Sequence, residues 1–342
     1  MHAGAIYTVL AFLSLAGCMN GAIDEPRPHH AYRSAGQENT AMVAASHAPA
    51  RDPRTSPRPL APAAARTTDD IRGTFGTFAN PPRKADGTKD LDRLLAELVE
   101  LKVNTYNYLI YHDADDWDAL KTFLPMAQER RIDVWVTVMP PSGSYPFRSK
   151  YSEPYRLNFT EWARAIAKLS LKHPNLVAWS IDDFTTDLKY FTPRRVRMIR
   201  DAAGEVNRAL AFVPTCYYRE TLRETARDYE GLADGILFPY RAESGDKYNV
   251  TDATRLEAEI KALRRHLGPG MPIVVDVYAS RLGNLPEATP EYVQKVMRVA
   301  RKFADGVHVF RHPVAGTEKW SVEKELFHKW AAEDASLEGG HR

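Results

Sequence analysis

The chain has 342 residues with 46 basic and 44 acidic side chains, so its formal net charge is +2. That balance gives no electrostatic reason to expect nucleic acid as a partner. The length suits one large domain or two small ones. Only two cysteines are present, Cys18 and Cys216, which argues against a disulfide framework or a cysteine-based metal site. Cys216 falls within a predicted strand and is expected to be a small buried hydrophobe.

The N-terminal residues have the pattern of a secretory signal. Residues 6–16 form an apolar run that is too short to be a stable membrane span. The run leads into Leu15-Ala-Gly-Cys18, which resembles the lipobox of bacterial lipoproteins, where the cysteine becomes the lipidated N-terminal residue. The resemblance implies a signal peptide over residues 1–17, lipidation of Cys18 and anchoring to a membrane of the bacterial cell envelope, on its periplasmic or cell-surface side.

Residues 18–66 have the composition of a disordered tether. Prolines recur among alanine, arginine and histidine with no sustained apolar period. Such a stretch cannot bury enough apolar surface to offset the entropy of an ordered chain. One folded domain is therefore expected over residues 67–335, followed by a C-terminal tail over residues 336–342.

From residue 71 onward the sequence alternates between strand and helix patterns. Strands are expected at residues 71–78, 104–111, 133–139, 176–181, 211–217, 235–239, 272–278 and 306–311. Helices are expected at residues 91–101, 117–130, 160–172, 193–210, 220–229, 252–267, 290–303 and 321–332, with Thr160 as the N-cap of the third and Pro193 in the first turn of the fourth. Eight strand–helix units in about 265 residues predict an α/β fold, a single-domain (β/α)8 TIM barrel. The alternative is an open doubly wound sheet, but Gly73-Thr-Phe-Gly76 does not match the phosphate loop that such a sheet usually carries.

Three aspartates are the candidate catalytic groups. In a barrel of this kind the catalytic side chains lie at the C-terminal ends of the strands. The apolar run of residues 176–181 ends in Asp182 and Asp183, and two acids this close push their pKa values apart, leaving a proton donor and a charged partner. A helix cap or a solvated loop is the simpler alternative. Asp276 interrupts an apolar strand, where a charge is costly unless it is paired or functional.

Other polar and aromatic strand ends are candidates for substrate binding, because aromatic rings stack on the C–H faces of sugars while polar groups bind hydroxyls. These residues are Asn80, Tyr108, Tyr111, Asp113, Tyr217, Tyr240, Tyr278 and Arg311. Packing is the alternative for a tyrosine, helix capping for Asp113, and an ion pair with a barrel acid for Arg311. His112 and His312 show no metal-ligand spacing, so neither a metal nor another cofactor is expected.

Two segments resemble family 84 of the glycoside hydrolases, the β-N-acetylglucosaminidases. They are Leu101-Lys-Val-Asn-Thr-Tyr-Asn-Tyr108 with its following Asp-rich loop, and Ser180-Ile-Asp-Asp-Phe184. Enzymes of that family are (β/α)8 barrels in which the acetamido oxygen of the substrate is the nucleophile. The resemblance implies that Asp182 orients the acetamido group and that Asp183 is the general acid/base. The family's lysine in the loop after the second strand is replaced here by Tyr111-His112.

The sequence therefore predicts a glycoside-hydrolase-like envelope lipoprotein that acts on a carbohydrate, N-acetylhexosamine-containing glycans included. One alternative is a conventional retaining or inverting glycosidase that uses Asp183 with Asp276. A carboxyl separation of roughly 5 Å would indicate retention and roughly 6.5–9.5 Å inversion. The other alternative is a non-catalytic carbohydrate-binding lipoprotein.

Overall fold

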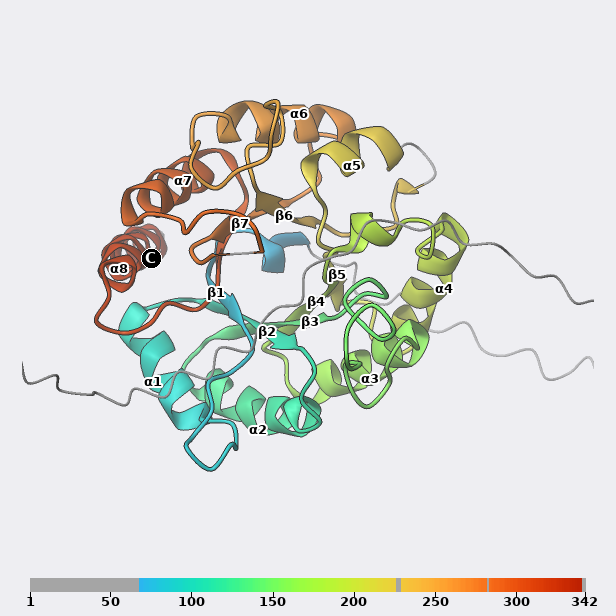
Figure 1. The fold of residues 1–342 in the computed structure, drawn as a ribbon. Coiled ribbons are helices and arrows are strands. Elements are labelled where there is room, and N and C mark those ends of the chain that lie inside the picture. The colour runs from blue at the N-terminus through green and yellow to red at the C-terminus, as the bar shows by residue number, and fades with distance from the viewer. Residues whose placement is uncertain (1–67, 226–228, 282, 340–342) are drawn as a thin grey trace, which may run out of the picture. The chain divides into compact units, whose positions relative to one another are not determined.

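Eight parallel strands alternate with eight α-helices along the residues that the computed structural model describes, which are 68–225, 229–281 and 283–339. The strands are β1 (Thr74–Ala79), β2 (Thr105–Ile110), β3 (Asp133–Val138), β4 (Leu176–Ile181), β5 (Ala211–Phe212), β6 (Ile236–Tyr240), β7 (Ile273–Tyr278) and β8 (Gly306–Phe310). They surround one axis, and the helices form an outer ring (Figure 1). The predicted (β/α)8 fold is confirmed.

The helices pack their apolar stripes against the outside of the barrel. They are α1 (Leu91–Leu101), α2 (Asp116–Glu129), α3 (Phe159–Lys172), α4 (Pro193–Gly204), α5 (Tyr218–Glu224), α6 (Leu256–Leu267), α7 (Pro290–Phe303) and α8 (Glu318–Gly339). Helix α1 has the predicted bounds, and Pro193 lies in the first turn of α4 as expected. Helix α8 continues past its predicted end and through residues 336–339 of the predicted tail.

The N-cap of α3 is Asn158 rather than Thr160. The Asn158 side chain accepts a hydrogen bond from the backbone N–H of Glu161, 3.2 Å away, and so satisfies one of the N–H groups left open at the helix start. Asparagine and threonine are both favoured caps. The sequence pattern alone therefore did not show which of Asn158 and Thr160 is the N-cap.

The barrel closes at a weak seam. Neighbouring strands pair in the order β5-β4-β3-β2-β1-β8-β7-β6, and β5 meets β6 through one bridge between Thr215 and Leu237. In that bridge the N–H of Leu237 donates to Pro214 O at 3.0 Å and the N–H of Cys216 donates to Leu237 O at 2.8 Å. Pro214 has no N–H to donate, so β5 is shorter than the predicted residues 211–217.

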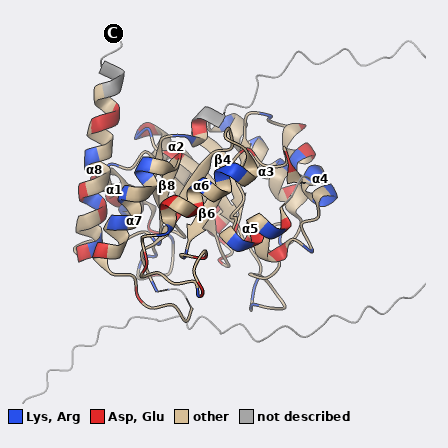
Figure 2. Ribbon diagram, turned by 90° about the horizontal axis from the view of Figure 1, so that it is seen from above, with Lys and Arg blue, Asp and Glu red and all other residues tan. Residues whose placement is uncertain are grey.

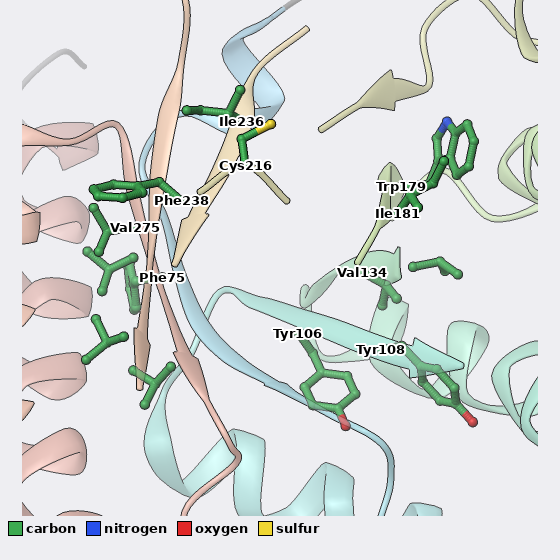
Figure 3. Packing of buried hydrophobic residues seen from close by; sticks show 14 of the residues in the cluster. Phe75, Tyr106, Tyr108, Val134, Trp179, Ile181, Cys216, Ile236, Phe238 and Val275 are labelled. Atoms are coloured by element: carbon green, nitrogen blue, oxygen red, sulfur yellow. The ribbon is translucent and has the colours of Figure 1, made fainter. Parts of the chain in front are cut away.

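Side chains of each strand alternate between two cores. The barrel interior is filled from every second position, for example by Leu109, Trp135 and Val274. The intervening positions form a larger core between barrel and helices, to which Tyr106 and Tyr108 belong; Figure 3 shows both on the helix side of β2. The side of the strand on which a residue lies therefore decides whether it can reach the barrel axis.

The predicted signal peptide, Cys18 and the tether lie outside the described residues. Within the described part of the chain, every helix is too short or too polar to cross a bilayer. Basic and acidic residues are interspersed on the outer helices (Figure 2). Cys216 is buried and unpaired, as expected for a hydrophobe at the β5–β6 seam.

Candidate active site

Asp182 and Asp183 lie at the C-terminal end of β4. The backbone N–H of Asp182 still donates to Val138 O of β3 at 2.9 Å, so the sheet fixes the position of Asp182. Asp183 follows with a left-handed backbone (φ 44°), which aspartate tolerates better than most residues, and the chain turns into the 3-10 helix η2 (Phe184–Asp187). Adjacent strand residues normally point to opposite sides. The turn at Asp183 lets both carboxyls take part in one cluster.

The Asp182 carboxyl is stabilised in its protonated form. Its Oδ1 accepts a hydrogen bond from the backbone N–H of Asp183 at 3.0 Å, and the Thr215 side chain is a second partner. Burial and the neighbouring Asp183 carboxyl outweigh these contacts and hold the pKa of Asp182 well above its usual range.

The Asp183 carboxyl has more groups that favour its charged form. Burial is the largest influence and raises the pKa of Asp183, but the Tyr217 hydroxyl donates to Oδ1, and the positive charges of Arg241 and Arg148 oppose the rise, so the pKa of Asp183 is raised less than that of Asp182. The Tyr217 hydroxyl lies 3.4 Å from that of Tyr278. Of the two adjacent acids, Asp183 is therefore the one that ionises more readily.

Arg241 is a member of this site that follows Tyr240 at the end of β6, where Tyr240 is the predicted substrate-binding residue. Its guanidinium stacks on the Tyr217 ring at 3.9 Å and on the Tyr248 ring at 4.9 Å. Its Nε donates to the buried carboxylate of Glu243 at 2.8 Å. The pattern selects Tyr240 on this strand, yet the residue in phase with the inward Leu237 and Pro239 is Arg241. Counting in steps of two from Leu237 would have found it.

Asp276 lies on β7 inside the barrel with only 2% of its surface exposed. Its Oδ1 has no hydrogen-bond partner among the described residues. Burial, followed by the charges of Asp182 and Asp183, holds the pKa of Asp276 well above its usual range. The fold thus brings the three predicted catalytic aspartates into mutual electrostatic contact, with Asp276 as a neutral acid.

A polar set lies in the barrel wall beside Asp276. His308 is the β8 residue in register with Asp276, is fully buried, and has no described partner at either ring nitrogen. Burial lowers the pKa of His308 to about 3, so its ring is neutral. Its ring centroid lies 4.5 Å from that of Trp135, whose Nε1 also lacks a described partner. The residues around Asp276 thus supply no charge to balance a carboxylate.

The prediction that strand-end tyrosines bind substrate is wrong for Tyr108 and Tyr240. Both are fully buried on the helix side of their strands, where their hydroxyls donate to Asp116 O at 3.1 Å and Asp252 O at 2.6 Å. The Tyr217 hydroxyl donates to the Asp183 carboxyl, and the Tyr278 hydroxyl lies 3.4 Å from the Tyr217 hydroxyl. The reason is the alternation of strand side chains, which places neighbouring positions on opposite faces.

Asn80 and Asp113 belong to an ion-pair network centred on Lys89. The buried Lys89 ammonium lies 2.6 Å from Asn80 Oδ1, 2.7 Å from Asp113 Oδ2 and 2.6 Å from Asp116 Oδ1. The Asn80 amide also donates to Leu109 O at 2.8 Å. These two predicted sugar-binding residues therefore tie together the loops after β1 and β2.

Tyr111 and Arg311 are exposed on the rim of the barrel. The Tyr111 ring lies 3.9 Å from the His112 ring, centroid to centroid, and is 37% exposed. The Arg311 guanidinium lies 5.7 Å from the centre of the Phe310 ring. Both side chains are available to a ligand at the C-terminal face, but neither contacts the three aspartates in the described structure.

The acidic loop after β2 is the one carboxylate group in the described residues with the spacing to hold a cation. It consists of Asp113, Asp115 and Asp116. Lys89 and Arg83 already neutralise it, with Arg83 2.6 Å from Asp113 and 3.0 Å from Asp115. A metal ion would have to displace these cations.

The two histidines considered as metal ligands are engaged by the protein. Nε2 of His112 donates to Gly143 O at 2.9 Å. Nδ1 of His312 lies 2.9 Å from the Thr77 hydroxyl and its Nε2 lies 3.0 Å from Glu97 Oε2. Neither ring is aimed at a group of carboxylates that could share an ion with it.

A cavity of ≈ 450 Å³ is lined by none of the three aspartates. Its lining comes from the loops after β1, β2 and β3: Arg83, His112, Asp113, Ala114, Asp115, Lys150, Tyr151 and Glu153. We place the reacting groups at the aspartates, because the perturbed acids and their hydrogen-bonded tyrosine are there. The cavity is a separate feature of the same barrel face.

No protein-family model matches this chain, and no curated protein matches its sequence. Solved structures do match its fold, and those named here are glycoside hydrolases. Endo-glycoceramidase II from Rhodococcus sp. is 14% identical, with 77% of this chain and 80% of that chain covered and a TM-score of 0.52. The endo-β-1,4-mannanase from Thermotoga petrophila is 10% identical, with 76% and 77% covered and the same TM-score of 0.52.

The chain spans 50% of the length of a third similar structure, a β-D-glucuronidase from Dictyoglomus thermophilum, over 75% of its own length, at 15% identity and a TM-score of 0.47. At such identities the likeness establishes the barrel fold, and a barrel hosts many chemistries. The resemblance to family 84 stays a prediction.

Proposed function

We propose that the protein is a glycoside hydrolase whose reacting groups are Asp182, Asp183 and Asp276. The observation that carries the proposal is a cluster of carboxyls with different partners at the C-terminal face of a (β/α)8 barrel: Asp183 accepts a hydrogen bond from the Tyr217 hydroxyl, whereas Oδ1 of Asp276 has no described partner. Glycoside hydrolysis needs one carboxyl that holds a proton for the leaving group and one that is charged beside the sugar ring. The surroundings of these aspartates favour that division.

In the proposed mechanism Asp182 donates the proton and Asp183 supplies the negative charge. Burial keeps Asp182 protonated, whereas Tyr217, Arg241 and Arg148 favour the charged form of Asp183. This order is the reverse of the roles implied by the family 84 resemblance. Asp276, below them, keeps a proton and avoids a third charge in the cluster.

For the substrate we propose a glycan that contains N-acetylhexosamine, on the strength of the adjacent acids after β4. With such a substrate the acetamido oxygen attacks the anomeric carbon, and the charged aspartate stabilises the acetamido group. A conventional glycosidase would instead use a protein carboxylate as nucleophile or as the base for water.

The test is hydrolysis of aryl glycosides, N-acetylhexosaminides and plain hexosides, with leaving groups of different acidity. Asp182→Asn should lose about 10²–10⁴-fold with poor leaving groups and little with activated ones, because a good leaving group needs no proton. Asp183→Asn should slow both kinds alike. If the two variants exchange these profiles, the roles implied by family 84 are correct.

Azide distinguishes the two kinds of nucleophile. Formation of a glycosyl azide of inverted anomer by Asp183→Asn would indicate a missing protein nucleophile and would contradict substrate assistance. Turnover confined to N-acetylhexosaminides without such rescue would support it. If all three asparagine variants keep wild-type turnover on every cleaved substrate, the aspartates are structural. If no glycoside is cleaved but sugars bind, the protein is a carbohydrate-binding barrel.

We also propose that the barrel is held in the bacterial cell envelope by a lipid on Cys18. The support is the lipobox-like Leu15-Ala-Gly-Cys18 followed by a proline-rich stretch. Cys18→Ser should move the protein from the membrane fraction to the soluble fraction while its circular dichroism spectrum stays the same. Cys216→Ala is the control, since it removes the other cysteine and should leave fractionation unchanged. An unaltered distribution of Cys18→Ser would refute the anchor.

A further inference from the structure

The exposed aromatic side chains of the described residues gather on one face of the barrel. The large hydrophobics with high exposure include four aromatic ones, namely Tyr111, Tyr145, Phe147 and Tyr248. All four lie on loops that follow a strand: Tyr111 after β2, Tyr145 and Phe147 after β3, and Tyr248 after β6. They are therefore on the face that carries the three aspartates. The exposed aliphatic residues Leu171 and Met198 lie on the outer helices α3 and α4 instead.

Two of these aromatics, Tyr111 and Tyr145, lie against residues that line the cavity of ≈ 450 Å³. Tyr151 lines the cavity, and its ring centroid lies 5.8 Å from that of Tyr145. His112 also lines it and lies against the Tyr111 ring. Phe147 lies on the same loop as Tyr145 and is 70% exposed. An exposed aromatic patch of this kind is typical of a surface that binds a ligand or a partner.

The loop after β3 lines part of the cavity and also carries Arg148. Arg148 of that loop lies close enough to Asp183 and to His112 to act on the pKa of both side chains. Its backbone N–H is fixed by Ser144 O at 2.9 Å. A ligand bound at the aspartates could therefore extend over Arg148 into the cavity.

We propose that Tyr111, Tyr145, Phe147 and Tyr151, here called the aromatic rim, form a subsite for the outer units of an oligosaccharide, so that the substrate is a chain and not a single sugar. The inference rests on the proposed function. Exposed rings offer faces for the C–H patches of sugars, and the cavity offers the amine of Lys150 to hydroxyls. The cavity lining contains both positively and negatively charged side chains, which can donate to and accept from the hydroxyls of a sugar.

The test is calorimetric titration with di- and hexasaccharides of the chito-, cello- and manno-oligosaccharide series. Asp183→Asn is used as the background so that chains are not cut during the titration. In at least one series the hexasaccharide should bind about tenfold more tightly than the disaccharide, the gain expected from one or two ring contacts. Tyr145→Ala and Phe147→Ala should each reduce that gain and leave disaccharide binding unchanged. Leu171→Ala and Met198→Ala are the matched controls and should retain it.

Several results would overturn the inference. They are a hexasaccharide gain that survives both rim substitutions, the absence of any gain, and no binding in any series. A rim substitution that changes the mass measured by light scattering without changing sugar affinity would assign the rim to a protein partner. If the protein cleaves aryl glycosides but the rim variants keep the wild-type dependence of affinity on chain length, the subsite is contradicted and the proposed hydrolase is not. If oligosaccharide binding depends on the rim but no glycoside is cleaved, the proposed hydrolase is contradicted and the subsite is supported.

Discussion

At the scale of single residues, Asp276 links burial to the pH dependence of stability. Its carboxyl has a higher pKa in the folded protein than in the unfolded chain, so the folded state holds the proton more tightly. The free energy of unfolding then falls as pH rises from about 4, the ordinary aspartate pKa, through the folded-state pKa. The stability linked to this group is complete only below pH of about 4.

Asp276→Asn should remove that loss, because asparagine cannot ionise. We expect the unfolding free energy of the variant minus that of wild type to be about 1 kcal/mol or more larger at pH 8 than at pH 4. Urea denaturation of both proteins at both pH values measures this difference. Asp201→Asn, a change of an exposed aspartate on α4, is the control. An equal difference between variant and wild type at the two pH values would mean that Asp276 is not held as a neutral acid.

Tyr217→Phe tests the hydrogen bond that favours the charged form of Asp183. Loss of the hydroxyl should raise the pKa of Asp183, so the acid limb of the pH–rate profile should move to higher pH. Turnover at neutral pH should fall about tenfold, as expected for a lost hydrogen bond to a charged group.

Tyr240→Phe is the matched control for Tyr217→Phe. It also removes a tyrosine hydroxyl from a strand end, but that hydroxyl donates to Asp252 O on the helix side. It should cost about 1 kcal/mol in unfolding free energy and leave the pH–rate profile in place. If the acid limb shifts equally in both variants, the Tyr217 hydroxyl has no specific effect on the ionisation of Asp183.

At the scale of elements, Lys89 joins the ends of β1 and β2. Its ammonium is the partner of Asp116, which is fully buried at the start of α2. Removing one member of a buried pair leaves the other charge uncompensated. Lys89→Met should therefore lower the free energy of unfolding by about 3–5 kcal/mol in chemical denaturation.

Lys121→Met is the control for Lys89→Met. Lys121 forms an exposed pair with Asp118 one turn away on α2. Such a pair contributes at most about 1 kcal/mol, so this variant should remain near wild-type stability. Comparable losses in the two lysine variants would mean that burial of the Lys89 network adds nothing.

At the scale of the whole barrel, the β5–β6 seam is the place where the wall should open most readily. Two residue pairs in register join β5 to β4 and one bridge joins the segment after β5 to β6, whereas β2 and β3 share six residue pairs in register. Pro214 and Pro239 remove two N–H donors near the seam. In hydrogen exchange, the amides of residues 211–216 should exchange faster than those of residues 134–138. Equal protection of the two segments would refute a weak seam.

The sequence by itself determined the barrel. Apolar strand patterns, helical stripes such as that of residues 91–101 and short connections are local signals, and each is produced by interactions within a few residues. The same local reasoning placed Asp182 and Asp183 at a strand end and Asp276 in the C-terminal half of another strand. It holds because a parallel barrel brings all C-terminal strand ends to one face.

The tertiary structure decided which strand-end residues meet. Tyr108 and Tyr240 carry the same side chain as Tyr217 and Tyr278, yet lie on the other side of the wall, since the phase of each strand is fixed by packing and not by residue type. The partners of a carboxyl were equally beyond the sequence. Whether an aspartate meets Lys89, Tyr217 or no partner depends on contacts across tens to hundreds of residues, and burial against those partners sets its charge.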